Sequence, residues 1–161
     1  MIVTQGTVGI FRDISLVSTS SAVISFVTPQ VFFNKDHWDV RIAAYLMCKR
    51  DAQGPVTASL DGLPFTTETT LFCEKDGEQR VDLDLSIPEN AVKRWFPVGY
   101  GEHPTYGLTV SFGSEAKTVH IGFRTAELIR EKIGEDEESM YFRINDIDVF
   151  IRGESGESGS P

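Results

Sequence analysis

Histidines, cysteines and acidic residues are the side chains of this sequence that could bind a metal ion or carry out catalysis. The three histidines, His37, His103 and His120, are scattered, and none has a cysteine or a carboxylate at the spacing of a zinc site. The acidic run 135–138 could bind a cation, although a solvated acidic loop is the more common role of such a run. The sequence therefore predicts no metal centre.

Motifs for nucleophilic catalysis and for phosphate binding are also missing from the sequence. It contains no Gly-x-Ser-x-Gly turn. Gly99-Tyr100-Gly101 is followed by Pro104 and not by the helix that a phosphate-binding loop opens. The 24 acidic residues could supply a glycosidase-like pair of carboxylates, but such a pair must face a cleft. Because a small two-sheet protein fills the space between its sheets with side chains, we expect no catalytic residue and no cofactor.

The net charge argues against two classes of binding partner, and the two cysteines raise the question of a disulfide. A net charge of −9 disfavours binding to nucleic acids and to anionic membranes. No stretch reaches the roughly 20 apolar residues of a membrane helix, and the first residues lack the basic start and apolar run of a signal peptide. Cys48 and Cys73 could pair if their strands are neighbours, although lone buried cysteines more often act as small hydrophobic residues.

Short segments with alternating polarity predict the elements that would have to position any site. The clearest is 37–50, in which one face is apolar: Trp38, Val40, Ile42, Ala44, Leu46 and Cys48. Segment 22–27 predicts a strand that ends at Pro29, and Asp76-Gly77 predicts a tight turn that joins 66–75 and 79–87 in a hairpin.

The second half of the chain continues the same pattern. Further strands are predicted at 106–112 and 117–129, followed by a last pair within 140–153 that bends at Asn145-Asp146. No segment is a convincing helix; 126–138 would form a turn or two at most, because its acidic residues repel one another at helical spacing. Short strands with turns between them predict an all-β fold, an antiparallel β-sandwich.

Segment 94–108 is unusually rich in aromatic residues, prolines and glycines. Its prolines fix the backbone and its glycines permit positive φ, which predicts a rigid corner capped by large side chains. An alternative is a platform on which a sugar ring stacks, formed by Trp95, Tyr100 and Tyr106.

The same segment carries one of four motifs that resemble glycoside hydrolase family 2, particularly the β-mannosidases. Residues 95–106 resemble Trp-Trp-Pro-x-Gly-x-Gly followed by Glu/Gln-Pro-x-Tyr, with Phe96 in place of the second tryptophan. Residues 9–14, 122–128 and 141–153 resemble further family motifs in the family's order, so the resemblance covers about residues 5–153. It implies structural roles for the matching positions Trp95, Phe96, Pro97, Gly99, Gly101, Pro104, Tyr106, Arg124, Glu127, Asn145 and Gly153.

The family order of jelly roll, immunoglobulin-like sandwich and (β/α)₈ barrel implies how this chain is organised. Residues 1–20 would be the end of the sugar-binding jelly roll, and 21–133 the immunoglobulin-like β-sandwich. Residues 134–153 would form an acidic loop and a hairpin leading towards the barrel, and 154–161 a disordered, low-complexity tail. The implied partners are the jelly-roll and barrel domains of a longer chain, and a weak carbohydrate contact is a further partner that the resemblance allows.

The activity implied by the resemblance belongs to that longer chain. The parent would hydrolyse terminal β-D-mannosides with retention, in carbohydrate and glycoprotein catabolism. The family's two catalytic glutamates lie in the barrel and have no counterpart here, so we expect an accessory fragment that is inactive alone. The alternative is a stand-alone sandwich module that binds carbohydrate or protein. The location would be lysosomal if the parent is an animal β-mannosidase, and nothing in this chain decides it.

Overall fold

Two antiparallel sheets and a smaller third sheet make up the protein, seen in a computed structural model that describes residues 18–134 and 138–149. The first sheet has the order β1-β2-β5, the second β4-β3-β6-β7 and the third β10-β9-β8. The strands are β1 (Ala22–Asn34), β2 (His37–Cys48), β3 (Gln53–Leu60), β4 (Thr66–Phe72), β5 (Gly77–Pro88), β6 (Tyr106–Phe112), β7 (Glu115–Ile121), β8 (Ala126–Lys132), β9 (Glu138–Ile144) and β10 (Ile147–Val149). One 3₁₀ turn, Glu89–Ala91, follows β5.

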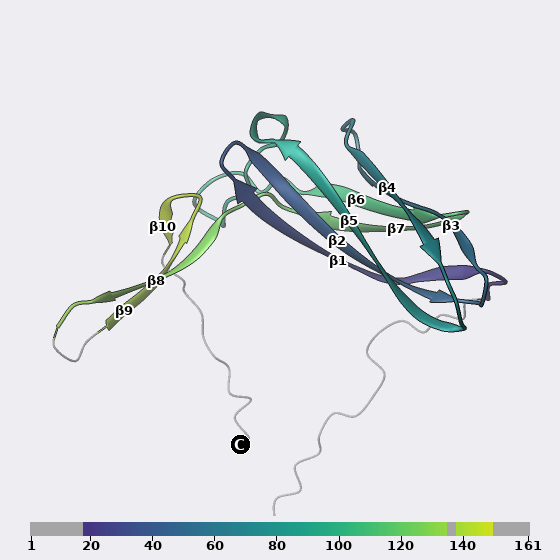
Figure 1. Cartoon of the computed structure of the whole chain (residues 1–161). Coiled ribbons are helices and arrows are strands. Elements are labelled where there is room, and N and C mark those ends of the chain that lie inside the picture. Colours follow the sequence, from purple (N-terminus) through teal and green to yellow (C-terminus); the bar gives the residue numbers. More distant parts are fainter. Residues whose placement is uncertain (1–17, 135–137, 150–161) are drawn as a thin grey trace, which may run out of the picture.

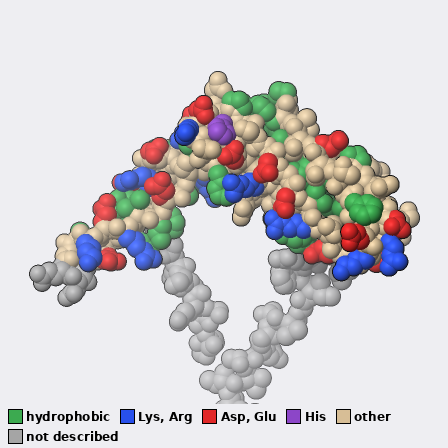
Figure 2. Space-filling model, viewed as in Figure 1, with side chains coloured by type: hydrophobic (Ala, Val, Ile, Leu, Met, Phe, Trp, Pro, Cys, Tyr) green, Lys and Arg blue, Asp and Glu red, His purple; other side chains and the backbone are tan. Residues whose placement is uncertain are grey.

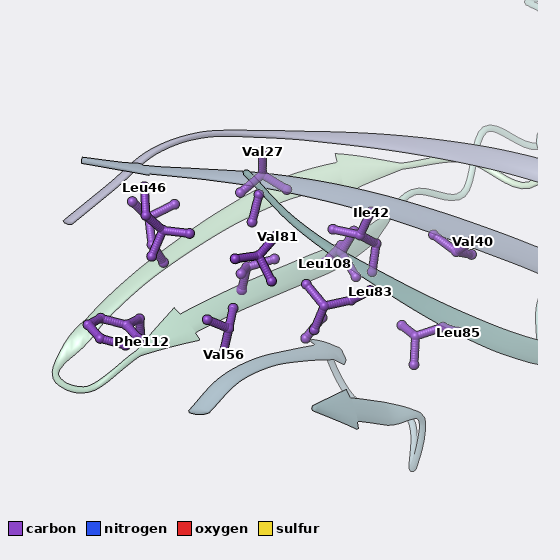
Figure 3. Close-up of a cluster of buried hydrophobic side chains, with 14 of the residues drawn as sticks. Val27, Val40, Ile42, Leu46, Val56, Val81, Leu83, Leu85, Leu108 and Phe112 are labelled. Atoms are coloured by element: carbon purple, nitrogen blue, oxygen red, sulfur yellow. The ribbon is translucent and has the colours of Figure 1, made fainter. Parts of the chain in front are cut away.

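The first two sheets pack face to face and enclose the core, so the predicted antiparallel β-sandwich is confirmed. Strand β2 buries every second residue, as its alternation predicted, and Trp38, Val40 and Leu46 are fully buried. Figure 3 shows side chains of both sheets meeting between the layers, among them Ile42 and Leu83 from the first sheet and Val56 and Leu108 from the second. Apolar burial of this extent is the main term that stabilises such a fold.

The hairpin predicted around Asp76-Gly77 is wrong. Strand β4 pairs with β3 in the second sheet, whereas β5 pairs with β2 in the first, so the connection between them crosses from one sheet to the other. The carboxylate of Asp76 instead accepts a 2.7 Å hydrogen bond from the backbone N–H of Arg50, which holds the pKa of Asp76 below its ordinary value. A local turn signal cannot specify the partner of a strand, because pairing also depends on which face each strand must bury.

The end predicted for the first strand is also wrong. Strand β1 continues through Pro29 to Asn34, and Pro29 lies opposite Ile42 of β2. Proline removes one backbone donor, which an edge strand tolerates because only one of its sides is paired. Strand β1 is such an edge, at the end of the order β1-β2-β5.

The third sheet extends away from the sandwich like an arm (Figure 1). The strand predicted over 117–129 is two strands, β7 and β8. Strand β8 runs on to Lys132, through part of the segment 126–138 for which a turn or two of helix was considered, and it pairs with β9 along its whole length. This strand falls inside the range 21–133 expected for the sandwich, yet its partners are the strands of the following hairpin. The bend predicted at Asn145-Asp146 is confirmed: both residues have positive φ, 49° and 66°, between β9 and β10.

Cys48 and Cys73 form a disulfide, contrary to the more common role of small hydrophobic residues. Cys48 ends β2 in the first sheet, and Cys73 follows β4 in the second, with their Cα atoms 6.2 Å apart. Their strands are not paired neighbours in one sheet; they face each other across the core. The bond therefore links the two layers of the sandwich, close to the crossing that leads from β4 to β5.

Candidate functional site

Within the described residues, no group of side chains is arranged to bind a metal ion and no helix could span a membrane. No three His, Cys, Asp or Glu side chains within residues 18–134 and 138–149 are placed to hold a metal ion. Among the same residues, no helix is long and apolar enough to span a bilayer. Most of the acidic run, 135–137, lies outside the described residues. The family-motif positions are the remaining candidates for a functional role.

Trp95 lies where the sandwich meets the third sheet. Its backbone N–H donates a 2.9 Å hydrogen bond to the carbonyl of Phe123, and Arg94 forms a parallel bridge with the same residue. A Cβ added to Gly122 would come within 3.2 Å of the Cβ of Trp95. The two segments thus run in close contact, and a side chain at position 122 would be tight against Trp95.

The loop after Trp95 is closed by hydrogen bonds of its own. Phe96 donates from its backbone to the carbonyl of Glu102 at 2.9 Å, and the ring N–H of His103 donates to the carbonyl of Phe96 at 2.7 Å. Pro97 accepts from the backbone of Tyr100 at 3.0 Å, across a turn in which Gly99 has a φ of 89°. A Cβ on Gly101 would lie 3.0 Å from the side chain of Phe96. Pro104 lies half-buried just before β6.

Tyr106 ties this loop to the core. Its hydroxyl oxygen accepts a 2.7 Å hydrogen bond from the backbone N–H of Lys93, and its ring packs edge-on against Phe123 with centroids 5.3 Å apart. Phe123 in turn packs edge-on against the buried Trp38, with centroids 5.5 Å apart. The corner and the sandwich core therefore form one continuous aromatic cluster.

Asn145 connects the third sheet to this corner. It is the buried polar residue of the described chain, 6% exposed. Its Nδ2 donates to the carbonyl of Trp95 at 2.9 Å, and its Oδ1 accepts from the backbone N–H of Thr125 at 3.0 Å. Its own N–H donates to the hydroxyl of Thr125 at 3.1 Å. One side chain thus joins the turn after β9, the segment before β8 and the loop after β5.

Arg94 joins the same elements, and sequence reasoning did not single it out. Its guanidinium lies 2.6 Å from the carboxylate of Glu89 and 3.8 Å from that of Asp146, in the turn of the third sheet. It also stacks over Phe33, 4.8 Å from the ring centroid. The position just before the aromatic motif was its main signal in the sequence, because Phe33 and Asp146 are distant along the chain.

The three aromatic residues proposed as a sugar platform do not share one free surface. Arg124 covers a face of Trp95, with its guanidinium carbon 4.5 Å from the ring centroid. Tyr106 is held edge-on against Phe123, and Tyr100 lies in the turn at the outer end of the loop. Glu127 lies opposite Arg143 in the third sheet. Gly153 lies outside the described residues.

Two of the open grooves on the described surface involve aromatic side chains. One, of about 720 Å³, lies beside the corner between β1 and the start of β8, and its walls include Phe32, Trp95 and Arg124. The other, of about 840 Å³, follows the outer face of the first sheet and is lined mainly by polar side chains, with Gln30, Arg41 and Asp84 among them. Next to the second groove, Phe26 stacks on Tyr45 with centroids 4.2 Å apart.

Comparison with known proteins gives a consistent family assignment, although no protein-family model matches the chain. The β-mannosidase B of Aspergillus flavus is 33% identical over 159 residues, covering 91% of this chain and 18% of its own length. The β-mannosidase of Mus musculus is 31% identical over 157 residues, covering 90% of this chain and 18% of its own length. The solved β-D-mannosidase of Dictyoglomus thermophilum has a TM-score of 0.68 at 22% identity, covering 83% of this chain and 17% of that one.

The length relationship is as informative as the identity. The chain spans less than a fifth of each of these relatives, while they match almost all of it. Its sandwich also has the fold of one section of the solved β-D-mannosidase. The chain therefore belongs to the β-mannosidase-like proteins of glycoside hydrolase family 2, of which it matches one section.

Proposed function

We propose that this chain is the accessory sandwich section of a β-mannosidase-like glycoside hydrolase, with a structural role. The observation that carries the proposal is the match itself: relatives named β-mannosidase cover 91% of the chain with 18% of their own length. The described residues add support, because several family-motif positions, such as Trp95, Gly101 and Asn145, pack against backbone and against one another.

In this proposal the section holds its neighbouring domains at a fixed angle. Asn145 and Arg94 join the third sheet to the sandwich through contacts at 2.9 Å and 3.8 Å, so the arm is tied to the body at its base. The neighbours would be a jelly-roll domain and a catalytic barrel. The longer protein would hydrolyse terminal β-D-mannosides with retention through two glutamates of the barrel. The chain alone would have no activity.

A chimera tests this role. Residues 18–149 replace the matching section of the Aspergillus flavus β-mannosidase B, and hydrolysis of a chromogenic β-mannoside is compared with the parent enzyme, with the parent lacking the section and with the isolated chain. We expect activity in the chimera and none in the isolated chain or in the deletion. Turnover by the isolated chain, or a folded but inactive chimera, would contradict the proposal.

A stand-alone binding module is the second candidate, favoured by the groove on the outer face of the first sheet. This groove combines hydrogen-bonding side chains such as Gln30 and Asp84 with a stacked aromatic pair at its edge, the exposed Phe26 and the half-buried Tyr45. Sugars are bound by such mixtures of polar groups and flat apolar faces. Titration of the isolated chain with mannose, followed by NMR, tests it: shifts confined to the groove at millimolar sugar would favour this candidate, and unchanged spectra would eliminate mannose as its ligand.

A further inference from the structure

The third sheet has one apolar face and one polar face. In an antiparallel sheet, residues opposite each other on neighbouring strands lie on the same side, and successive residues alternate. The register therefore places seven apolar residues on one side, Ala126, Leu128, Met140, Phe142, Ile144, Ile147 and Val149, and at the outer end of the same side the charged Arg130, Lys132 and Glu138. The other side holds Glu127, Ile129, Glu131, Ser139, Tyr141, Arg143 and Asp148.

The polar face is built to meet water. The guanidinium of Arg143 lies 2.7 Å from the carboxylate of Asp148 and donates to the hydroxyl of Tyr141 at 3.2 Å. That hydroxyl donates in turn to Glu131 at 3.0 Å. These groups satisfy one another along the strands, so this side of the sheet needs no covering layer.

On the apolar face, in contrast, the apolar side chains are left largely exposed along the arm. Met140 is 65% exposed, Leu128 45% and Ile147 41%. Figure 2 shows hydrophobic side chains exposed among charged ones along this arm. A small sheet that buries one face gains most of its stability from that layer, and a contiguous apolar patch on a protein surface marks an interaction site.

We propose that this face is a docking surface for another domain of the same longer β-mannosidase-like protein. The inference rests on the proposed function, and the length of the relatives supports it: more than four fifths of their residues lie outside the section that this chain matches. The complementary surface is apolar over the area of Leu128, Met140 and Ile147. It carries a carboxylate near Arg130, which lies opposite Met140 on the same face.

The docking restricts the arm at both of its ends. At the base, Asn145 already fixes the turn of the sheet to Trp95. Contact along the apolar face fixes the outer half, which has no such tie to the sandwich among the described residues. The sandwich then transmits the position of one domain to another through a rigid arm.

Amide hydrogen exchange in the chimera described above tests the docking independently of catalysis. Backbone amides of 126–132 and 138–149 should exchange at least tenfold more slowly in the chimera than in the isolated chain. Met140→Lys and Leu128→Lys should abolish that protection, while leaving the thermal unfolding of the isolated chain within 1–2 °C, on the order expected for exposed positions. Ile129→Lys, on the opposite face of the same strand, is the matched control and should keep the protection.

Each outcome of this experiment is decisive for one of the two proposals. The docking is overturned if the amides of the arm exchange equally fast in the chimera and in the isolated chain. It is also overturned if both lysine variants keep the protection. Both conclusions hold even when the chimera hydrolyses its substrate. A folded chimera that shows the protection but no hydrolysis contradicts the proposed function and leaves the docking standing. If the chimera does not fold, sedimentation of the isolated chain tests the docking instead. A dimer that Met140→Lys dissociates would assign the face to a second copy and overturn the proposal. A monomer that forms a complex when the section-deleted parent is added would support it.

Discussion

The side-chain amide of Asn145 donates a 2.9 Å hydrogen bond to the backbone carbonyl of Trp95, a residue 50 positions earlier in the chain. The two belong to different parts of the fold, since Asn145 turns the hairpin of the third sheet and Trp95 begins the loop that caps the sandwich. Removal of this side chain should therefore destabilise the third sheet more than it destabilises the sandwich.

Asn145→Ala should destabilise the arm by about 2 kcal/mol, because the carbonyl of Trp95 and the N–H of Thr125 lose their partner in a partly buried place. The positive φ of 49° at this position adds to the cost, since alanine adopts it less readily than asparagine. Hydrogen exchange of 138–149 measures the effect locally. Ser139→Ala, farther along β9, is the control; an equal loss in both variants would show that the amide is not responsible.

Loss of the disulfide should cost about 3 kcal/mol of unfolding free energy, the value expected for a bond that closes a loop of 25 residues. The expected result is a lower urea midpoint for the chain in reductant than in its absence. The double variant Cys48→Ala and Cys73→Ala should unfold at one midpoint in both conditions. Two free thiols in the intact mass of the oxidised protein would contradict the bond itself.

Arg124→Ala should expose a face of Trp95, because the guanidinium now covers the ring at 4.5 Å. The cation–π contact contributes about 0.5 kcal/mol at such an exposed site. The chain has two tryptophans, and Trp38 is fully buried, so a red shift in emission reports on Trp95. The measurement is tryptophan fluorescence, with Arg130→Ala as the control on a strand that does not contact the ring. Identical spectra for the native chain and Arg124→Ala would show that the contact does not persist in solution.

His37 should titrate above its ordinary pKa of 6.5, since its ring N–H donates to Asp36 at 3.0 Å and Asp39 lies 3.3 Å from its other nitrogen. A raised pKa in the folded chain means that protonation favours folding. This contribution is complete below pH 6.5 and disappears as the pH rises through the folded pKa. NMR titration of the His37 ring checks the direction. In Asp36→Asn the pKa should fall back towards 6.5, and a pKa below 6.5 in the native chain would refute the assignment.

The sequence was sufficient for the parts of the fold that depend on neighbours in the chain. The alternation of 37–50 predicted both strand β2 and the residues that it buries, because a strand places successive side chains on opposite faces. The turn at Asn145-Asp146 was predictable for a similar reason, since asparagine and aspartate tolerate positive φ. The family motifs likewise pointed to the β-mannosidase-like proteins, to which the chain is similar.

What the tertiary structure alone decided is which distant segments meet. The sequence by itself favoured a hairpin of β4 with β5, yet each pairs elsewhere, because Leu71 of β4 and the apolar face of β5 reach a core shared by two sheets. The Cys48–Cys73 bond, the pairing of β8 with β9 and the contact of Arg94 with Asp146 depend on the same long-range packing. Local chemistry sets the conformation of each segment, whereas burial of apolar area, which is a property of the whole fold, selects its partners.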